Sequence, residues 1–135
     1  MDIQETLTRQ LPLYARVLLQ KGICLQKDQI LVINAPVEAS RFATLLTEEA
    51  YKAGAAQVVF NWYCNGTTRL RYEYETQDKF ESVPHWRSEF NLDYYRKGAA
   101  FLSLISADPY AMKGIDRKKI MAWQKAFHQA VKEYS

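Results

Sequence analysis

The stretch EEAYKAGAAQVVFNWY, residues 48–63, decides the fold of this chain. It predicts a helix that stops at Gly54 and a strand that begins at Gln57, because QVVFNWY is rich in β-branched and aromatic residues. A helix followed at once by such a strand is the repeating unit of nucleotide-binding sheets. The unit therefore either binds a ligand itself or supports a site elsewhere.

The residues just before this stretch predict a buried strand and the start of the same helix. QILVINA, residues 29–35, is an unbroken apolar run of strand length, which suits a strand covered on both faces. Pro36 precedes the helical pattern and Gly54 follows it, which matches the usual asymmetry of the two helix ends. One helical face carries a single polar residue, Glu49, among Phe42, Leu45, Leu46, Ala50 and Ala53.

The N-terminal part predicts another helix, from about Ile3 to Gln20. Its apolar positions recur at spacings of three and four and define one face: Leu7, Leu11, Tyr14 and Leu18. Gly22 is a suitable stop, and Pro12 inside the pattern predicts either a kink or two shorter helices.

The C-terminal part predicts a third strand and a last helix. AAFLSLISA, residues 99–107, reads as the strand, and Asp116 can cap a helix from about Arg117 to the end of the chain. The apolar face of this helix is expected to comprise Ile120, Trp123, Phe127, Val131 and Tyr134. Lysines fall elsewhere on the helix, as solvated charges should.

The middle of the chain, residues 65–98, allows two interpretations. TTRLRYEYET alternates apolar and charged residues with a period of two, which indicates a strand. A crossover between two parallel strands normally contains a helix instead, so we favour helical turns over residues 68–82. A further helix is expected to start near Pro84 and to stop at Gly98.

The order of these elements predicts an α/β fold, layered, with a mostly parallel sheet of at least three strands flanked by helices. Three strands make a small sheet whose edges need cover. We therefore expect residues 1–135 to be the first part of a longer protein.

Length and composition limit the class of protein to which this chain can belong. The chain has 135 residues, 48% hydrophobic and 24% charged, which fits one globular domain. A net charge of +3 is too small to indicate nucleic-acid binding. The N-terminus lacks the pattern of a signal peptide, and no apolar run is long enough to span a membrane. Two cysteines without a CxxC motif, Cys24 and Cys64, favour reduced thiols and a cytoplasmic protein.

The loop after the first predicted strand is the first candidate site. NAPVEAS contains no glycine, whereas close approach of a backbone to a pyrophosphate usually requires one. Asn34 and Ser40 remain candidates for a small anion at the helix start, against ordinary loop and capping roles. The two histidines, His85 and His128, fall in different predicted helices, so exposed helix positions are a better interpretation than metal ligation.

Candidates for nucleophilic chemistry are isolated from one another. Cys64 follows the second predicted strand, but without a histidine in a recognisable pattern it reads as a structural thiol. Ser103 and Ser106 lie in or after the third strand without a GxSxG motif. Asp108 follows the same strand, where a carboxylate can face a site, although an Asp-Pro turn explains it equally well.

Residues 69–98 interleave basic and aromatic residues, as some binders of single-stranded nucleic acid do. The same span holds six acidic and six basic side chains, so its charges cancel. Aromatic residues of a core or an interface explain the pattern better, and we expect no nucleic-acid partner.

A series of short motifs runs through most of the chain. It begins with Tyr14-Ala15, Lys21-Gly22, LQKDQILVINAP and EEAYKAGAAQVVFNWY. TRLRYEYE, Pro84-x-Trp86, GAAFLSLISADP and KGIDRKKI follow in order. In order and spacing this series resembles a known family, the M29 aminopeptidases. The resemblance runs from about residue 11 to residue 125, and it departs at Asp28, where the family often has glycine in this turn.

The resemblance implies that the chain is the N-terminal domain of a cytoplasmic exopeptidase that removes N-terminal amino acids from peptides. It further implies a homodimer and two divalent metal ions, zinc, cobalt or manganese, bound by a C-terminal catalytic domain. No metal ligand or catalytic residue of the family falls on a position present here. The fragment alone is then expected to be inactive and to hold no cofactor of its own.

The N-terminal domain is accordingly expected to pack against its catalytic domain and to help enclose the substrate cavity. Four residues are candidates for the cavity wall or the domain interface: Asn34, Trp62, Tyr63 and Asp108. The alternative is a standalone α/β module that binds a nucleotide or another anion at the loop from Asn34 to Ser40. No membrane partner is expected in either case.

Overall fold

A computed structural model describes residues 3–105 and 113–132 of the chain. These residues form two compact units, and each is described by itself. The first comprises the described residues up to Tyr63 together with Gly98–Ile105. The second comprises Cys64–Lys97 and the described residues from 113 onward.

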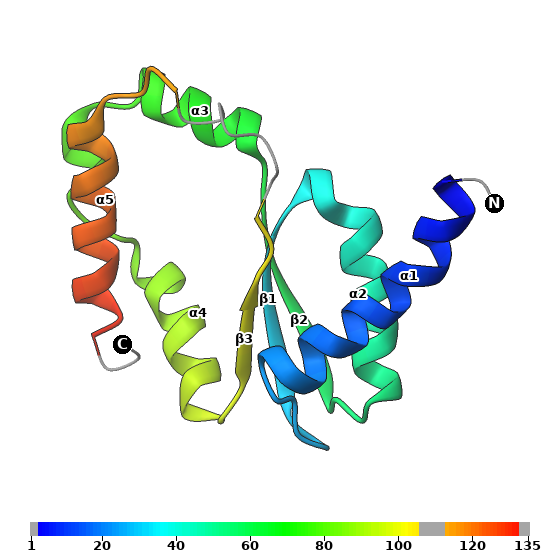
Figure 1. Ribbon diagram of the computed structural model, residues 1–135. Coiled ribbons are helices and arrows are strands. Elements are labelled where there is room, and N and C mark those ends of the chain that lie inside the picture. The colour runs from blue at the N-terminus through cyan, green and yellow to red at the C-terminus, as the bar shows by residue number, and fades with distance from the viewer. Residues whose placement is uncertain (1–2, 106–112, 133–135) are drawn as a thin grey trace. The chain divides into compact units, whose positions relative to one another are not determined.

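A parallel sheet of three strands is the centre of the first unit (Figure 1). Its strands are β1 (Ile30–Pro36), β2 (Gln57–Tyr63) and β3 (Ala100–Ser103), in the order β2-β1-β3. The predicted α/β class with a mostly parallel sheet flanked by helices is confirmed. β3 is shorter than the predicted strand over 99–107, and the last two residues of that stretch lie outside the described residues.

The central position of β1 explains its apolar sequence. β1 pairs with β2 on one side and with β3 on the other, so Ile33 lies between Phe60 and Leu102. Leu31, Val32 and Ile33 are fully buried. The prediction of a strand covered on both faces is therefore confirmed.

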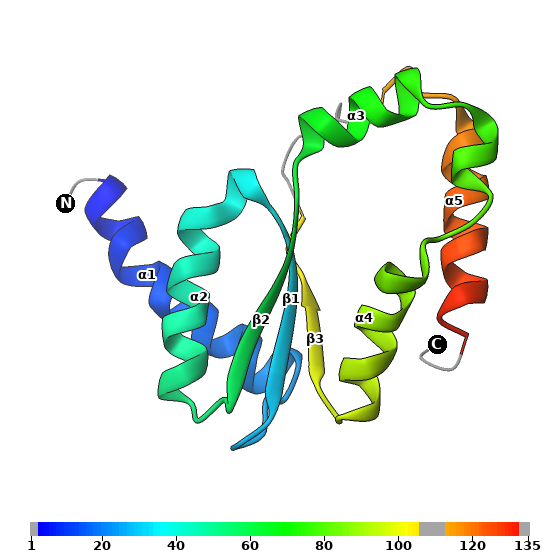
Figure 2. The same ribbon diagram turned by 180° about the vertical axis from the view of Figure 1, so that it is seen from behind.

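The two helices of the first unit, α1 (Ile3–Val17) and α2 (Ser40–Lys52), lie together on one side of the sheet (Figures 1 and 2). α1 continues as a π-helix over Leu18–Gly22, and a 3₁₀ turn, Val37–Ala39, precedes α2. One core cluster joins helices and sheet, and its buried members are Ala15, Leu19, Leu31, Ile33, Ala35, Leu46 and Ala50.

The buried side of α1 differs from the predicted one. Ala15 and Leu19 are buried, whereas Tyr14, which was expected on the core face, is 56% exposed. Its ring still packs on Phe42, with the ring centroids 5.8 Å apart. Ala15 belongs to the core cluster together with Leu46 and Ala50 of α2, and Tyr14 lies at the rim of this contact. The helix also runs through Pro12 without dividing into two.

The joint between α2 and β2 has the structure that the sequence predicts. Gly54 follows the end of α2 with a φ of +100°, in the region that favours glycine. Its carbonyl accepts a hydrogen bond of 2.8 Å from the backbone N–H of Asp28. Asp28 itself has a φ of +64°, so it occupies a left-handed conformation that glycine would adopt without strain.

The second unit is helical in its described residues: α3 (Asn65–Tyr74), a 3₁₀ turn (Gln77–Phe80), α4 (His85–Arg96) and α5 (Arg117–Ala130). Helical turns over residues 68–82 are therefore confirmed, and the strand alternative is wrong. The alternation in α3 has a helical cause. Arg69 pairs with Glu73 at 3.0 Å, and a second arginine and glutamate pair in the same i, i+4 relation. Two overlapping i, i+4 pairs two residues apart imitate a period of two.

An aromatic cluster holds the second unit together. The rings of Tyr72 and Phe80 stack with centroids 4.8 Å apart, and Trp123 of α5 meets Phe80 edge-on at 6.4 Å. The guanidinium of Arg71 lies 4.5 Å from the centroid of Phe80 and 4.2 Å from that of Trp123. Tyr72 and Phe80 thus belong to the core of this unit, whereas Tyr74 and Trp86 from the same stretch are 81% and 64% exposed.

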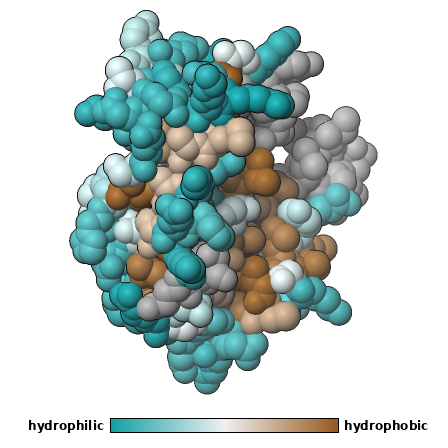
Figure 3. All heavy atoms as spheres, turned by 90° about the vertical axis from the view of Figure 1, so that its left-hand side faces the viewer, coloured by the Kyte–Doolittle hydropathy of each residue, from teal (hydrophilic) through white to brown (hydrophobic). Residues whose placement is uncertain are grey.

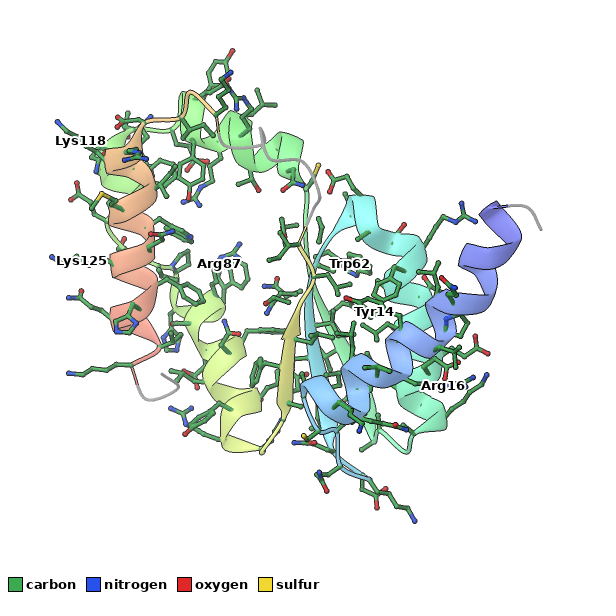
Figure 4. The ribbon with its side chains drawn as sticks, in the orientation of Figure 1. Tyr14, Arg16, Trp62, Arg87, Lys118 and Lys125 are labelled. Carbon is green, nitrogen blue, oxygen red and sulfur yellow. The ribbon has the colours of Figure 1, made fainter. Side chains whose placement is uncertain are left out.

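The predicted cap of the last helix is present. The side chain of Asp116 accepts a hydrogen bond of 2.9 Å from the backbone N–H of Lys118. Val131 is buried as expected, whereas Tyr134 lies outside the described residues. Lys118 and Lys125 point away from the packed side of α5 (Figure 4), and hydrophilic side chains cover much of the view from that side (Figure 3). No helix within the described ranges has both the length and the apolar character that a membrane span requires.

Candidate functional site

The carboxyl end of the sheet holds three of the four predicted cavity or interface residues. Side chains alternate between the two faces of a strand. Ile33 and Ala35 contribute to the core cluster with α1 and α2, so Asn34 between them belongs to the opposite face. By the same alternation Tyr63 shares the face of Asn34, whereas Trp62 lies on the face of α1 and α2. Asp108, the fourth predicted residue, lies outside the described residues.

A pair of amide side chains joins β1 to β2 near this end. Asn34 and Asn61 are direct partners in the parallel register. The Nδ2 of Asn61 donates a hydrogen bond of 2.9 Å to the Oδ1 of Asn34. Both side chains are partly buried, so the bond satisfies polar atoms that would otherwise lose water, and a bond of this kind contributes about 1 kcal/mol.

Tyr63 reaches across the end of the sheet. Its hydroxyl donates a hydrogen bond of 3.2 Å to the carbonyl of Leu104, which follows β3. The backbone N–H of Leu104 in turn donates to the carbonyl of Asn34 at 2.8 Å. Burial raises the pKa of the Tyr63 phenol, and the carboxylate of Glu38 raises it further. The phenol therefore stays protonated and acts as a fixed donor.

Trp62 forms an aromatic platform with its neighbour on the same face. The rings of Phe60 and Trp62 stack with centroids 4.5 Å apart and an interplanar angle of 8°. Phe60 packs against the core cluster, while Trp62 remains 43% exposed (Figure 4). One side of this platform is thus anchored in the core, and its outer part is open to a partner.

The loop after β1 gives little support to the anion alternative. The Asn34 amide oxygen already accepts from Asn61, and the loop carries an acidic residue, Glu38, beside the helix start. The carbonyl of Ser40 accepts from Thr44 inside α2. The loop from Asn34 to Ser40 thus contains a carboxylate and no cationic residue, and Arg41 follows it in the first turn of α2.

The other predicted candidates are taken one by one. His85 and His128 are exposed helix residues, as expected. Cys24 and Cys64 form no disulfide within the described residues, and Ser103 is exposed at the end of β3. Ser106 lies outside the described residues.

The described residues also decide whether this part of the chain can bind a metal ion. Residues 3–105 and 113–132 hold no group of three or more His, Cys, Asp or Glu side chains that could bind a metal ion. The described residues therefore do not fit a metal ion. The carboxyl end of the sheet offers amides, a phenol and a stacked indole, groups that can form hydrogen bonds and stacking contacts.

Sequence reasoning found the end of the sheet but missed the contacts there. The Asn34–Asn61 pair was detectable, since both residues occupy the fifth position of strands of equal length. No sequence signal indicated that the Tyr63 hydroxyl reaches the carbonyl after β3.

These features first define a class: an α/β protein with a parallel sheet, whose carboxyl edge is where sheets of this kind place their ligands. The chain matches the family described as thermophilic metalloprotease (M29) over residues 7–135. It belongs to that family, so the resemblance seen in the motifs is confirmed.

Similar proteins are aminopeptidases of bacteria. The chain is 35% identical over 130 residues to aminopeptidase AmpS of Bacillus subtilis, covering 96% of this chain and 32% of AmpS. It is 32% identical over 124 residues to aminopeptidase T of Thermus thermophilus, covering 92% of this chain and 30% of that protein. The chain thus spans about a third of the length of these relatives.

A solved structure supports the same relation. The chain superposes on wild-type AmpT from Thermus thermophilus with a TM-score of 0.81 and 30% sequence identity. The match covers 95% of this chain and 32% of that one.

Proposed function

We propose that this chain is the N-terminal α/β domain of a metal-dependent aminopeptidase that removes N-terminal amino acids from peptides. The observation that carries the proposal is the match to the M29 family over residues 7–135, together with relatives that are named aminopeptidases. The chain corresponds to about a third of those relatives, so most of the enzyme's chemistry belongs to a part not represented here.

Its role is to support the reaction without performing it. Two divalent metal ions, zinc, cobalt or manganese, would be bound by a C-terminal catalytic domain, and they would supply Lewis-acid chemistry for peptide hydrolysis there. The described residues offer no ligand set for such ions, which supports this division of labour. The 135-residue chain alone is inactive on this proposal.

The domain packs against its catalytic partner and closes one side of the substrate cavity. The carboxyl end of the sheet is the best candidate for this wall, with Asn34, Trp62, Tyr63 and the undescribed Asp108. Trp62 and Tyr63 carry exposed aromatic surface next to polar groups, the composition that interfaces favour. The proposal further includes a homodimer in the cytoplasm, which the reduced cysteines suit.

The proposal is tested by comparing two proteins with an aminoacyl-anilide substrate and Co²⁺ or Zn²⁺. The first is the chain alone, for which we expect no turnover. The second is a chimera in which the chain replaces the matching third of B. subtilis AmpS, for which we expect metal-dependent turnover. Robust turnover by the chain alone would overturn the proposal, and so would a folded, metal-loaded chimera without activity.

A further inference from the structure

We propose that the outer edge of β2, at Phe60 and Trp62, binds the main chain of a short extended peptide as an additional strand. The inference rests on the proposed function, in which a peptide is the substrate, and it assigns the surface that holds the substrate's backbone. Peptide recognition at a sheet edge relies on main-chain hydrogen bonds, with side-chain pockets adding selectivity.

Two hydrogen bonds establish which backbone groups of β2 point outward. The carbonyl of Asn34 accepts from Leu104 on the β3 side, so even-numbered residues of β1 face β3 and odd-numbered ones face β2. The odd-numbered residues of β2 then complete the ladder with β1. Independently, the N–H of Val58 donates to the hydroxyl of Tyr51 at 3.2 Å instead of to β1. Phe60 and Trp62 follow Val58 with the same orientation.

The outward groups of Phe60 and Trp62 are two donors and two acceptors. β2 ends the strand order, and no hydrogen bond from the described residues reaches these four groups. Backbone groups of this kind on an edge strand are a template for another extended chain. Outward N–H and C=O groups recur at every second residue of β2. This spacing matches the backbone of two or three residues of a bound extended peptide.

The sequence of β2 lacks the features that normally protect an edge. QVVFNWY contains no charged residue and no proline, and its pairing with β1 is regular over all seven residues. Exposed edges are usually blunted by lysine, proline or a bulge. The stacked rings of Phe60 and Trp62 lie beside the open groups and offer an apolar surface for one side chain of the bound peptide.

The position of Tyr51 favours a short peptide over a second copy of the chain. Its hydroxyl accepts from the N–H of Val58, so that donor of the edge is already engaged and the open donors are those of Phe60 and Trp62. Symmetric pairing of two copies would therefore be limited to the same two residues from each chain. That overlap is small beside the roughly 800 Å² per partner that stable interfaces bury. A substrate peptide needs no more than these contacts, because the catalytic domain holds its N-terminus.

The test is a titration of the ¹⁵N-labelled chain with the capped peptide acetyl-Thr-Val-Thr-Val-Thr-amide, monitored by NMR. We expect saturable shifts of the amide signals of Phe60 and Trp62, and slower hydrogen exchange at both. The same peptide methylated on every backbone nitrogen should bind at least about tenfold more weakly, because its donors are lost. Equal shifts with both peptides, or no shift at the two amides, would overturn the proposal.

Variants of the chain separate the backbone from the side chain. Trp62→Val removes the indole and keeps the outward N–H, whereas Trp62→Pro removes both. We expect the proline variant to bind the peptide about fivefold to tenfold more weakly than the valine variant. Ser103→Pro, at an outward position on the opposite edge, is the matched control and should bind normally. Protected amides at Asn61 and Tyr63 show that β2 is intact in each variant.

Separate measurements test the oligomeric state and the proposed function. Sedimentation of the unliganded chain tests the second copy: a dimer that Trp62→Pro dissociates would place a copy, rather than a peptide, on this edge and contradict the proposal. The capped peptide binds without metal or hydrolysis. Loss of peptide binding with an active chimera would refute only the edge assignment, and peptide binding with an inactive chimera would refute only the proposed function.

Discussion

Replacing Gly54 by alanine tests the helix-to-strand joint on which the first unit depends. Gly54 has a φ of +100°, and a Cβ at this position would lie 3.2 Å from the Cγ of Lys27. Both the backbone conformation and the contact oppose any larger residue. We expect the variant to be less stable by about 1–2 kcal/mol.

The magnitude follows from three contributions. A left-handed conformation costs an L-residue roughly 1–2 kcal/mol, and a φ of +100° lies beyond the centre of that region, so the upper value applies. The contact with Lys27 adds little, because a flexible side chain can move by a few tenths of an ångström. Alanine also restricts the unfolded chain, which offsets about 0.4–1 kcal/mol.

Two other glycines of the same unit serve as controls. Gly98 has a φ of +74° with no atom within 4 Å of the added Cβ, so Gly98→Ala isolates the backbone cost. The Cβ added at Gly22 would meet only Leu18 Cδ2 at 3.9 Å, an ordinary contact, and Gly22 lacks a positive φ. Gly22→Ala should be neutral or stabilising by up to about 1 kcal/mol.

The measurement is urea unfolding of the three variants, with thermal unfolding as a second readout. A loss of this size lowers Tm by about 3–6 °C in a chain of this length. The expected order of stability is Gly22→Ala, then Gly98→Ala, then Gly54→Ala. A Gly54→Ala variant as stable as Gly22→Ala would refute the reasoning, because neither the conformation nor the contact would then exist in solution.

Three further predictions concern charged side chains. The hydrogen bond from Arg16 lowers the pKa of Glu49, so the ionised pair stabilises the fold near neutral pH, and this contribution is lost as the pH falls through the lowered pKa. Glu49→Gln should therefore make stability depend less on pH below about pH 4 in an acid-unfolding experiment. An unchanged pH dependence would contradict this. Arg71→Lys should destabilise the second unit by about 1 kcal/mol, because lysine loses the planar stacking between two rings; urea unfolding followed by tryptophan fluorescence measures it, and equal midpoints would count against it. Asp28→Gly should stabilise the first unit by about 0.5–1 kcal/mol by relieving its positive φ; a lower Tm would show that the Asp28 side chain contributes more than its strain costs.

Much of the fold was predictable because local patterns and tertiary packing agree. The apolar run in β1 fits a strand that is covered on both faces. Gly54 fits the end of a helix, where a positive φ is needed. The two ends of α2 and the cap at Asp116 are local hydrogen-bonding features that depend on few neighbours. The helical turns over residues 68–82 required an argument from the crossover, since the alternating sequence pattern there favoured a strand.

The face of α1 was not predictable from spacing alone. Tyr14 and Ala15 both satisfy a helical stripe, and the partner helix selects the smaller residue. The candidate site shows the same limit. The residues at the ends of its strands follow from the topology of the sheet. The hydrogen bond from Tyr63 to Leu104 and the one from Val58 to Tyr51 depend instead on how far a side chain reaches, and sequence periodicity does not encode this.

The most direct test of the account uses the AmpS chimera with Trp62→Pro and Trp62→Val. For each variant, kcat/KM is measured on a pentapeptide and on an aminoacyl-anilide, which has no main chain beyond its first residue. If the edge of β2 holds the backbone of the substrate, the ratio of the peptide value to the anilide value is about tenfold lower for the proline variant than for the valine variant. The same ratio in both variants would contradict the account.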